Sequence, residues 1–135
     1  MYGNRITSLH PNLFKNSVEL KNVSVDNNRI IDIIPSTFRN SSRLRNLDIS
    51  RNQVTFIHPS TFIHNNELNC LQLEGNNTTE IGNNLFRGLE QLEDLKLSNN
   101  NTEELNPLIF HNTFTSTNIF FQKVSKLRRF NLAKI

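Results

Sequence analysis

Short apolar triplets recur along the chain at a fixed interval of 24 residues. Each triplet has the form LxxLxL, in which the last two aliphatic residues lie two apart and therefore point to the same side of an extended strand. We expect one short strand per unit, and because about 20 residues remain to return the chain, the strands should pair in parallel through right-handed crossovers. The triplets are Leu20/Val23/Val25, Leu44/Leu47/Ile49, Leu68/Leu71/Leu73 and Leu92/Leu95/Leu97.

Asparagine and phenylalanine keep the same 24-residue interval. An asparagine follows each triplet, where the strand turns out of the sheet, and its side chain offers both an acceptor and two N–H donors to turn backbone groups above and below it. We therefore expect a buried ladder of asparagines, and a spine of stacked phenylalanines beneath the convex side. The ladder positions are Asn28, Asn52, Asn76 and Asn100, and the spine positions are Phe14, Phe38, Phe62, Phe86 and Phe110.

The complete unit, LxxLxLxxNxIxxIxPxxFxxxxx, covers roughly residues 4–110 and resembles the leucine-rich repeat. Its 24-residue length and its x-P-x-x-F tail are similar to the subclass found in Toll-type receptor ectodomains, Slit-type guidance proteins and secreted insect immune proteins. This resemblance implies an α/β-type solenoid, a horseshoe segment with a parallel β-sheet on its concave face and a mostly irregular or short helical convex side.

One leucine-rich-repeat domain is expected over residues 1–135, with partial units at both ends. The fifth unit contains about eleven extra residues within 111–126, because the next apolar triplet is Leu127/Phe130/Leu132. This insertion is either a functional loop or a tolerated bulge on the convex side or a rim, with Phe121 in the spine slot. The expected units are about 1–19, 20–43, 44–67, 68–91, 92–126 and 127–135.

Both ends fall inside a repeat, which indicates a fragment of a longer protein or an incomplete gene model. Extracellular relatives usually close their ends with disulfide-bonded cysteines, whereas Cys70 is the only cysteine of this chain. Uncapped ends expose apolar surface and unpaired strand backbone, so we expect homo- or hetero-association through them. At the start, this surface should lie under Leu9, Leu13 and Phe14.

The sequence contains no enzymatic signature, so we expect no enzyme activity, no catalytic or metal-binding residue and no cofactor. No apolar run is long enough to predict a transmembrane helix, and no signal peptide is visible at the start. Residues 105–135 hold five Lys and Arg and no acid. This basic end either attracts polyanions or is a solvated stretch, and we expect no nucleic-acid partner.

Five asparagines stand in Asn-x-Ser/Thr sequons. Asn76 and Asn100 are ladder positions whose amides should be buried, which leaves Asn22, Asn40 and Asn77 as candidate N-glycosylation sites. Sequons are frequent by chance in a chain so rich in Asn, Ser and Thr. The resemblance, and not the sequons, therefore implies an extracellular or cell-surface glycoprotein. A further asparagine, at position 65, is expected in an exposed convex loop.

Leucine-rich repeats generally bind ligands through the outward-facing positions of their strands. No aromatic residue occupies these positions here, so the residues fit a binding face and a merely solvated face equally well. We expect a non-enzymatic protein-binding module of a secreted or cell-surface protein, for example a receptor ectodomain in immune recognition, adhesion or guidance. The alternatives are a structural or matrix scaffold component and a targeting segment of a larger enzyme or receptor kinase. The candidate concave binding face consists of Ser24, Asp26, Asn46, Asp48, Gln72, Glu74, Asp94, Lys96 and Arg129.

Overall fold

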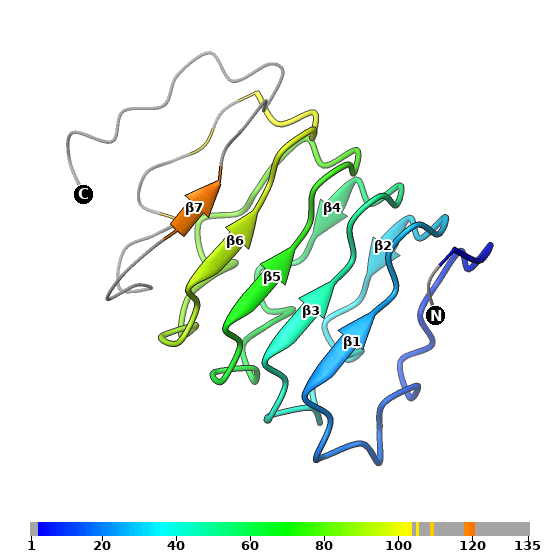
Figure 1. Ribbon diagram of the computed structural model, residues 1–135, viewed down its shortest axis with the longest axis vertical. Coiled ribbons are helices and arrows are strands. Elements are labelled where there is room, and N and C mark those ends of the chain that lie inside the picture. The colour runs from blue at the N-terminus through cyan, green and yellow to red at the C-terminus, as the bar shows by residue number, and fades with distance from the viewer. Residues whose placement is uncertain (1–2, 104, 106–108, 110–117, 121–135) are drawn as a thin grey trace.

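The computed structural model describes residues 3–103, 105, 109 and 118–120. Its strands form a five-stranded parallel main sheet, in the order β1-β3-β5-β6-β7, and a two-stranded parallel sheet of β2 and β4 on the return path of the coils (Figure 1). The described residues form no α-helix, so the fold is a leucine-rich-repeat solenoid with turns and short strands outside the main sheet. The strands are β1 Asn22–Ser24, β2 Asp32–Ile33, β3 Asn46–Asp48, β4 Phe56–Ile57, β5 Cys70–Gln72, β6 Asp94–Lys96 and β7 Asn118–Phe120.

Neighbouring strands of the main sheet pair at a spacing of 24 residues. Asn22 pairs with Asn46, Asn46 with Cys70, and Cys70 with Asp94. Each pair therefore joins the same position of two successive units, so equivalent side chains line up in columns across the sheet. One column points into the coil and is buried, whereas the columns on either side of it form the open face of the sheet.

Aliphatic side chains of the strands and the phenylalanine spine fill the interior of the coils. The ring centroids of Phe14 and Phe38 lie 5.6 Å apart, and those of Phe38 and Phe62 lie 6.4 Å apart, in nearly parallel stacks. These contacts confirm the spine over three coils, whereas Phe110 lies outside the described residues. In the first coil Leu9 and Phe14 are buried, and only Leu13 is exposed among the three apolar residues expected at that end.

Each main strand from β1 to β6 is followed by a turn with one left-handed residue immediately before the ladder asparagine. Glycine and asparagine tolerate this conformation, which costs other residues roughly 1–2 kcal/mol. Arg51 is the exception, and its Cγ lies 3.4 Å from the Cβ that a side chain at Gly75 would add. After β1, β3, β5 and β6, respectively, these residues and their φ values are Asn27 (54°), Arg51 (53°), Gly75 (68°) and Asn99 (56°), and Gly3 (66°), directly before Asn4, has the same conformation ahead of β1.

Every ladder asparagine lies buried in its turn and bonds to its own coil. The oxygen of the Asn52 side chain accepts from the backbone N–H of Ile30 in the preceding coil at 3.0 Å. Its amide group donates to the carbonyls of Val25, Ile49 and Ser50 at 3.0–3.1 Å. The hydrogen bonds of each ladder side chain thus run within its own coil and back to the preceding coil, so the ladder has a direction along the chain.

The expectation that Asn65 is exposed is wrong. Its side chain is fully buried, and its amide group donates to the backbone carbonyls of Phe38 at 3.1 Å and Ser41 at 2.8 Å in the preceding coil. The Asn65 side chain therefore links two coils on the side of the solenoid away from the ladder. The physical reason is that this loop turns inward over the phenylalanine spine, where a side chain of this length reaches the neighbouring backbone.

The expected strand at Leu127 is also not the one that follows β6. The structure pairs Asp94 with Asn118 and Leu95 with Ile119, so β7 lies 24 residues after β6, inside the segment expected to bulge out of the sheet. The backbone N–H and C=O groups on the free edge of β6 need hydrogen-bond partners, which the next segment of the chain can provide. Ile119 pairs with Leu95 and so occupies the position of the second aliphatic residue of the triplet. Residues 111–117 and 121–135, including Phe121 and the triplet at 127–132, lie outside the described residues.

Candidate binding face

The structure places eight of the nine predicted face residues on the open side of the main sheet, on or just after β1, β3, β5 and β6. Ser24 and Asn46 are exposed, whereas the other six are partly buried between their neighbours in the columns. The ninth, Arg129, lies outside the described residues. The face is therefore a continuous surface whose side chains are positioned by the fixed spacing of parallel strands.

Hydrogen bonds hold several of these side chains in place. The amide group of Asn46 donates to the side-chain oxygen of Asn22 on the neighbouring strand at 2.6 Å. The hydroxyl of Ser24 donates to the carboxylate of Asp26 at 2.6 Å, and the carboxylate of Asp48 accepts from the Ser50 backbone N–H at 2.9 Å. Side chains ordered in this way lose less conformational entropy when a ligand binds.

Cys70 lies in the middle of the face. Its thiol donates to the Asp94 carboxylate at 3.5 Å and accepts from the Gln72 side-chain amide at 3.6 Å. Burial above all, together with the negative charge of Asp94, raises the pKa of the Cys70 thiol above its ordinary value. The group is therefore a protonated thiol at neutral pH, and because the thiolate is the nucleophile, this arrangement does not activate Cys70.

The open face is acidic, although the whole chain has a formal net charge of +3. Its described positions carry the carboxylates of Asp26, Asp48, Glu74 and Asp94 against the single ammonium group of Lys96, which gives a formal charge of −3. A shallow hollow of about 280 Å³ lies over β1, β3 and β5, between the side chains of Ser24, Asp48 and Gln72 and their neighbours. A positively charged ligand is favoured on such a surface.

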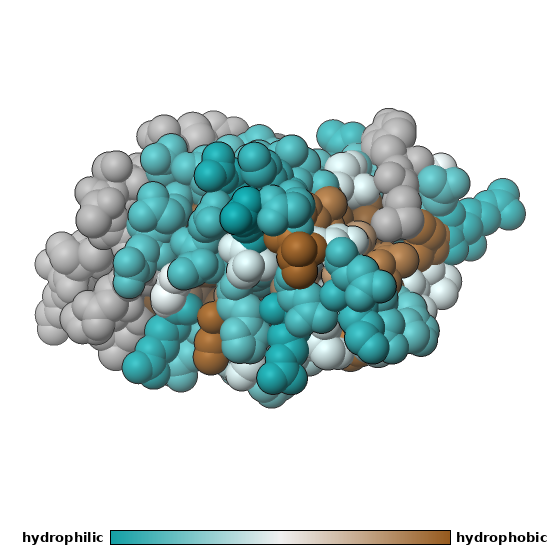
Figure 2. Space-filling view, turned by 90° about the horizontal axis from the view of Figure 1, so that it is seen from below, coloured by the Kyte–Doolittle hydropathy of each residue, from teal (hydrophilic) through white to brown (hydrophobic). Residues whose placement is uncertain are grey.

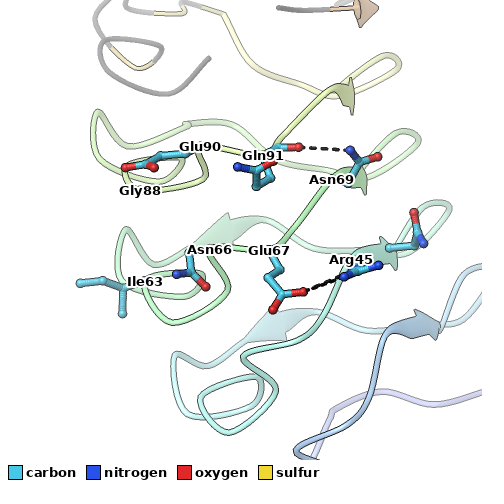
Figure 3. Close-up of a pocket in the computed structure, with 9 residues that line it drawn as sticks. Arg45, Ile63, Asn66, Glu67, Asn69, Gly88, Glu90 and Gln91 are labelled. Atoms are coloured by element: carbon cyan, nitrogen blue, oxygen red, sulfur yellow. Dashed lines mark hydrogen bonds and ion pairs between the residues drawn. The ribbon is translucent and has the colours of Figure 1, made fainter. Parts of the chain in front are cut away.

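A second concavity, which the sequence analysis missed, lies on the rim at the amino ends of the main strands. It is an open groove of about 900 Å³ between two successive coils, bordered by Ile63, Glu67, Gly88 and Glu90 (Figure 3). Viewed from this side, the surface is mostly hydrophilic, with hydrophobic groups at separate places (Figure 2). One signal in the sequence was Ile63, because the equivalent positions of other units hold Lys15, Arg39 and Arg87.

Within the described residues, no three His, Cys, Asp or Glu side chains come together as a metal site. In the same part of the chain, no helix has the length and apolar character needed to cross a membrane. Polar and charged side chains line the face and most of the groove, and Ile63 adds apolar surface at the groove's border.

The repeat register and the parallel solenoid agree with the comparison to known families. The family described as leucine-rich repeat matches residues 18–77. Residues 18–77 therefore consist of leucine-rich repeats. No curated protein matches the sequence.

Among solved structures, the fold of this chain is similar to that of three proteins. The leucine-rich repeat domain of APL1B is 23% identical over 87% of this chain, with a TM-score of 0.77. Toll from Drosophila, in its complex with Spatzle, is 28% identical over 84% of the chain with a TM-score of 0.77, and TLR13, in a complex with ssRNA13, is 21% identical over 84% with a TM-score of 0.70. The chain spans only 34%, 16% and 21%, respectively, of the lengths of these proteins.

Proposed function

We propose that this leucine-rich-repeat protein is a non-enzymatic protein-binding module of a secreted or cell-surface protein, and that it recognises its ligand through the open face of the main sheet. The observation that carries the proposal is the continuous face from β1 to β6, where polar side chains stand in register on rigid strands and surround a hollow. Sites on such rigid elements hold their side chains more accurately than sites on loops.

The similarity to Toll supports a protein ligand, because that structure is a complex with Spatzle. TLR13, by contrast, was solved with an RNA. The acidic open face of the present chain disfavours a polyanion, since its carboxylates and the phosphates of a nucleic acid would repel each other. A protein ligand with positive charge therefore fits the described residues better than a nucleic acid does.

Photo-crosslinking tests the proposed face. A photoreactive phenylalanine analogue in place of Gln72, at the centre of the face, should crosslink to a ligand selected from secreted proteins. The same analogue in place of Thr55, which is exposed beside β4 in the second sheet, should not. Equal crosslinking at both positions, or crosslinking at position 55 alone, would place the ligand elsewhere.

A substitution gives an independent check on the same face. Lys96 occupies the position equivalent to Gln72 in the next unit, so Gln72→Lys should fold normally. Because it adds a positive charge to the face that is proposed to bind a cationic ligand, we expect a loss of affinity of about tenfold, equivalent to about 1.4 kcal/mol. Titration calorimetry with the crosslinked ligand would measure it, and an unchanged Kd would contradict the proposal.

The proposed secretion can be tested through the sequons. Asn22, Asn40 and Asn77 have exposed side chains, whereas Asn76 and Asn100 are buried and donate from their amide nitrogens to backbone carbonyls. In a secretory host, we expect glycans on Asn40 and Asn77 and none on Asn76 and Asn100, as read by peptide mass spectrometry. A glycan on Asn100 of the folded protein would contradict this assignment.

A glycan on Asn22 would have a different consequence from one on Asn40 or Asn77. Asn22 belongs to β1 and faces the open side of the main sheet, where its side chain bonds to Asn46. A glycan there would cover one end of the proposed face and leave β3, β5 and β6 for the ligand. Occupancy at Asn22 in the same mass-spectrometry experiment therefore measures how much of the face is available.

A further inference from the structure

The walls of the rim groove are held by contacts between residues that lie 22 positions apart, almost one full turn of the solenoid. The guanidinium of Arg45 lies 3.2 Å from the Glu67 carboxylate, and the side-chain amide of Asn69 donates to the backbone carbonyl of Gln91 at 3.2 Å (Figure 3). These contacts leave the groove open to solvent between the loop that contains Ile63 and the loop that contains Gly88. Its volume of about 900 Å³ is in the range that binds a ligand of several side chains.

Ile63 breaks the pattern of the solenoid at this groove. Its side chain is 62% exposed, the highest value among the large hydrophobic residues that the structure describes as exposed. The equivalent residues Lys15, Arg39 and Arg87 are cations, which suit a solvated loop. An aliphatic side chain in the same place presents apolar surface at the border of a concavity, and such surface gains free energy when a partner covers it.

Gly88 adds no side chain to its part of the same groove. The equivalent positions of other units hold Asn16, Asn40 and His64, whereas Gly88 has a φ of 83° and a Cβ at this position would meet no atom within 4 Å. The left-handed conformation favours glycine. The absence of a side chain opposite Ile63 leaves room for an incoming group.

The groove and the hollow on the open face adjoin each other at Asn46, which lines both. The two concavities also share the sign of their charge. The groove adds the carboxylates of Glu67 and Glu90 and the guanidinium of Arg45 to the charge of −3 on the open face, so the joint surface has a formal charge of −4. The one cation of the groove, Arg45, is paired with the Glu67 carboxylate at 3.2 Å, so a cationic ligand that extends from the hollow across the rim meets a surface of net negative charge.

We propose that the hollow and the rim groove form one binding surface for a basic polypeptide segment, which places an aliphatic side chain against Ile63 across the rim at Asn46. This inference rests on the proposed function, in which the open face binds a protein, and adds the chemical class of the segment and the point where its apolar residue is anchored. Charge attracts the segment to the surface, and burial of the aliphatic side chain beside Ile63 fixes its register.

Synthetic peptides test the proposal by NMR on the full 135-residue chain with labelled isoleucine methyl and glutamine amide groups. The first peptide has four lysines around one leucine, the second replaces the leucine by serine, and the third replaces the lysines by glutamates. The first should shift the signals of both Ile63 and Gln72. The second should bind about tenfold more weakly, and the third should not bind.

Two variants of equal charge show whether the anchor lies at Ile63. Arg39 and Arg87 demonstrate that the fold accepts arginine at this position of the unit, so Ile63→Arg should fold and weaken the first peptide by about tenfold or more. Ile31, which is 53% exposed next to β2, provides the control Ile31→Arg, with an expected change below about twofold. Equal losses in both variants would overturn the anchor at Ile63.

The remaining outcomes separate this inference from the proposed function. Shifts at Gln72 without shifts at Ile63 would overturn the continuous surface while leaving the open face as a binding site. Tight binding of a single-stranded RNA oligonucleotide, used as a further probe, would overturn the basic polypeptide as the ligand class. Absence of shifts with the first peptide would also overturn it, and crosslinking at position 72 would still decide independently whether the open face binds a protein.

Discussion

Two columns of buried polar side chains run along this solenoid, and they treat their hydrogen-bonding groups differently. In the ladder after the main strands, the described asparagines accept from backbone N–H groups and donate to backbone carbonyls in coil after coil. On the return path, Oγ1 of Thr37 and Thr61, Oγ of Ser41 and Oδ1 of Asn65 are buried without a partner in the described part of the chain. The paired polar groups of the ladder therefore stabilise one side of each coil. The unpaired polar groups on the return path lower the free energy of unfolding.

The spine explains how the second column is tolerated. Phe38 and Phe62, which follow Thr37 and Thr61 directly in the sequence, are buried and stacked on each other. Burial of such large rings contributes several times the free energy that an unpaired hydroxyl costs. The convex side of these two coils is thus stabilised by apolar packing in spite of its polar atoms, whereas the ladder side depends on the pairing itself.

The largest expected effect is on the ladder, through Asn52→Ala. The three carbonyls that Asn52 bonds keep other donors, namely Asn28, Asn76 and the backbone N–H of Asn27, so the loss falls on the buried N–H of Ile30. We expect the free energy of unfolding to fall by about 1–3 kcal/mol. Urea denaturation would measure it, with the exposed Asn77→Ala as the control, and equal losses in the two variants would count against a stabilising ladder.

A smaller loss is expected for Asn65→Ala, about 1 kcal/mol. This variant loses two hydrogen bonds to the preceding coil, but Phe38 and Ser41 keep the backbone N–H groups of Ser41 and Leu44 as donors to their carbonyls. It also removes the unpaired Oδ1. The neighbouring Asn66 is exposed, so Asn66→Ala should cost less than about 0.5 kcal/mol in the same denaturation experiment. A loss for Asn65→Ala as large as that for Asn52→Ala would erase the difference between the columns.

The smallest expected effects have opposite signs in two threonines. Thr61→Val removes an unpaired buried hydroxyl and should raise the free energy of unfolding by about 0.5–1 kcal/mol. Thr78→Val removes a hydroxyl that donates to the Val54 carbonyl at 3.2 Å, so it should lower stability by a similar amount. Val54 itself occupies the equivalent position of the preceding unit, which shows that valine fits there. The melting temperatures of the two variants would decide, and shifts in the same direction would contradict the comparison.

Regularity along the sequence determined which of these features could be predicted. The main strands from β1 to β6, the ladder and the spine repeat one residue type at one position, so spacing alone identifies them. Asn65 could not be recognised in this way, because the equivalent residues are Ser17, Ser41 and Leu89, and its role depends on how the loop turns. The column of outward positions was predictable for the same reason as the strands, since it follows from period-2 geometry.

The strand after β6 and the rim groove could not be predicted from the 24-residue spacing. At β7 the leucine and asparagine markers are replaced, with Ser116 and Val124 at two of the expected positions, so the apolar triplet at Leu127 was the better match to the pattern. Pairing with β6 instead follows from the backbone, which any sequence can provide. The groove depends on Ile63 and Gly88, two departures from the repeat whose proximity only the stacking of coils reveals.

The direction of the asparagine ladder has a consequence for how the protein is made. Asn52 accepts from the N–H of Ile30, and Asn76 accepts from the N–H of Val54, so each coil receives its partner from the coil that is translated after it. Chains leave the ribosome with the N-terminus first. A newly made coil therefore keeps one backbone N–H unpaired until the following coil has been synthesised and packs against it. The hydrogen bonds of each coil are thus completed only after the next coil has been made.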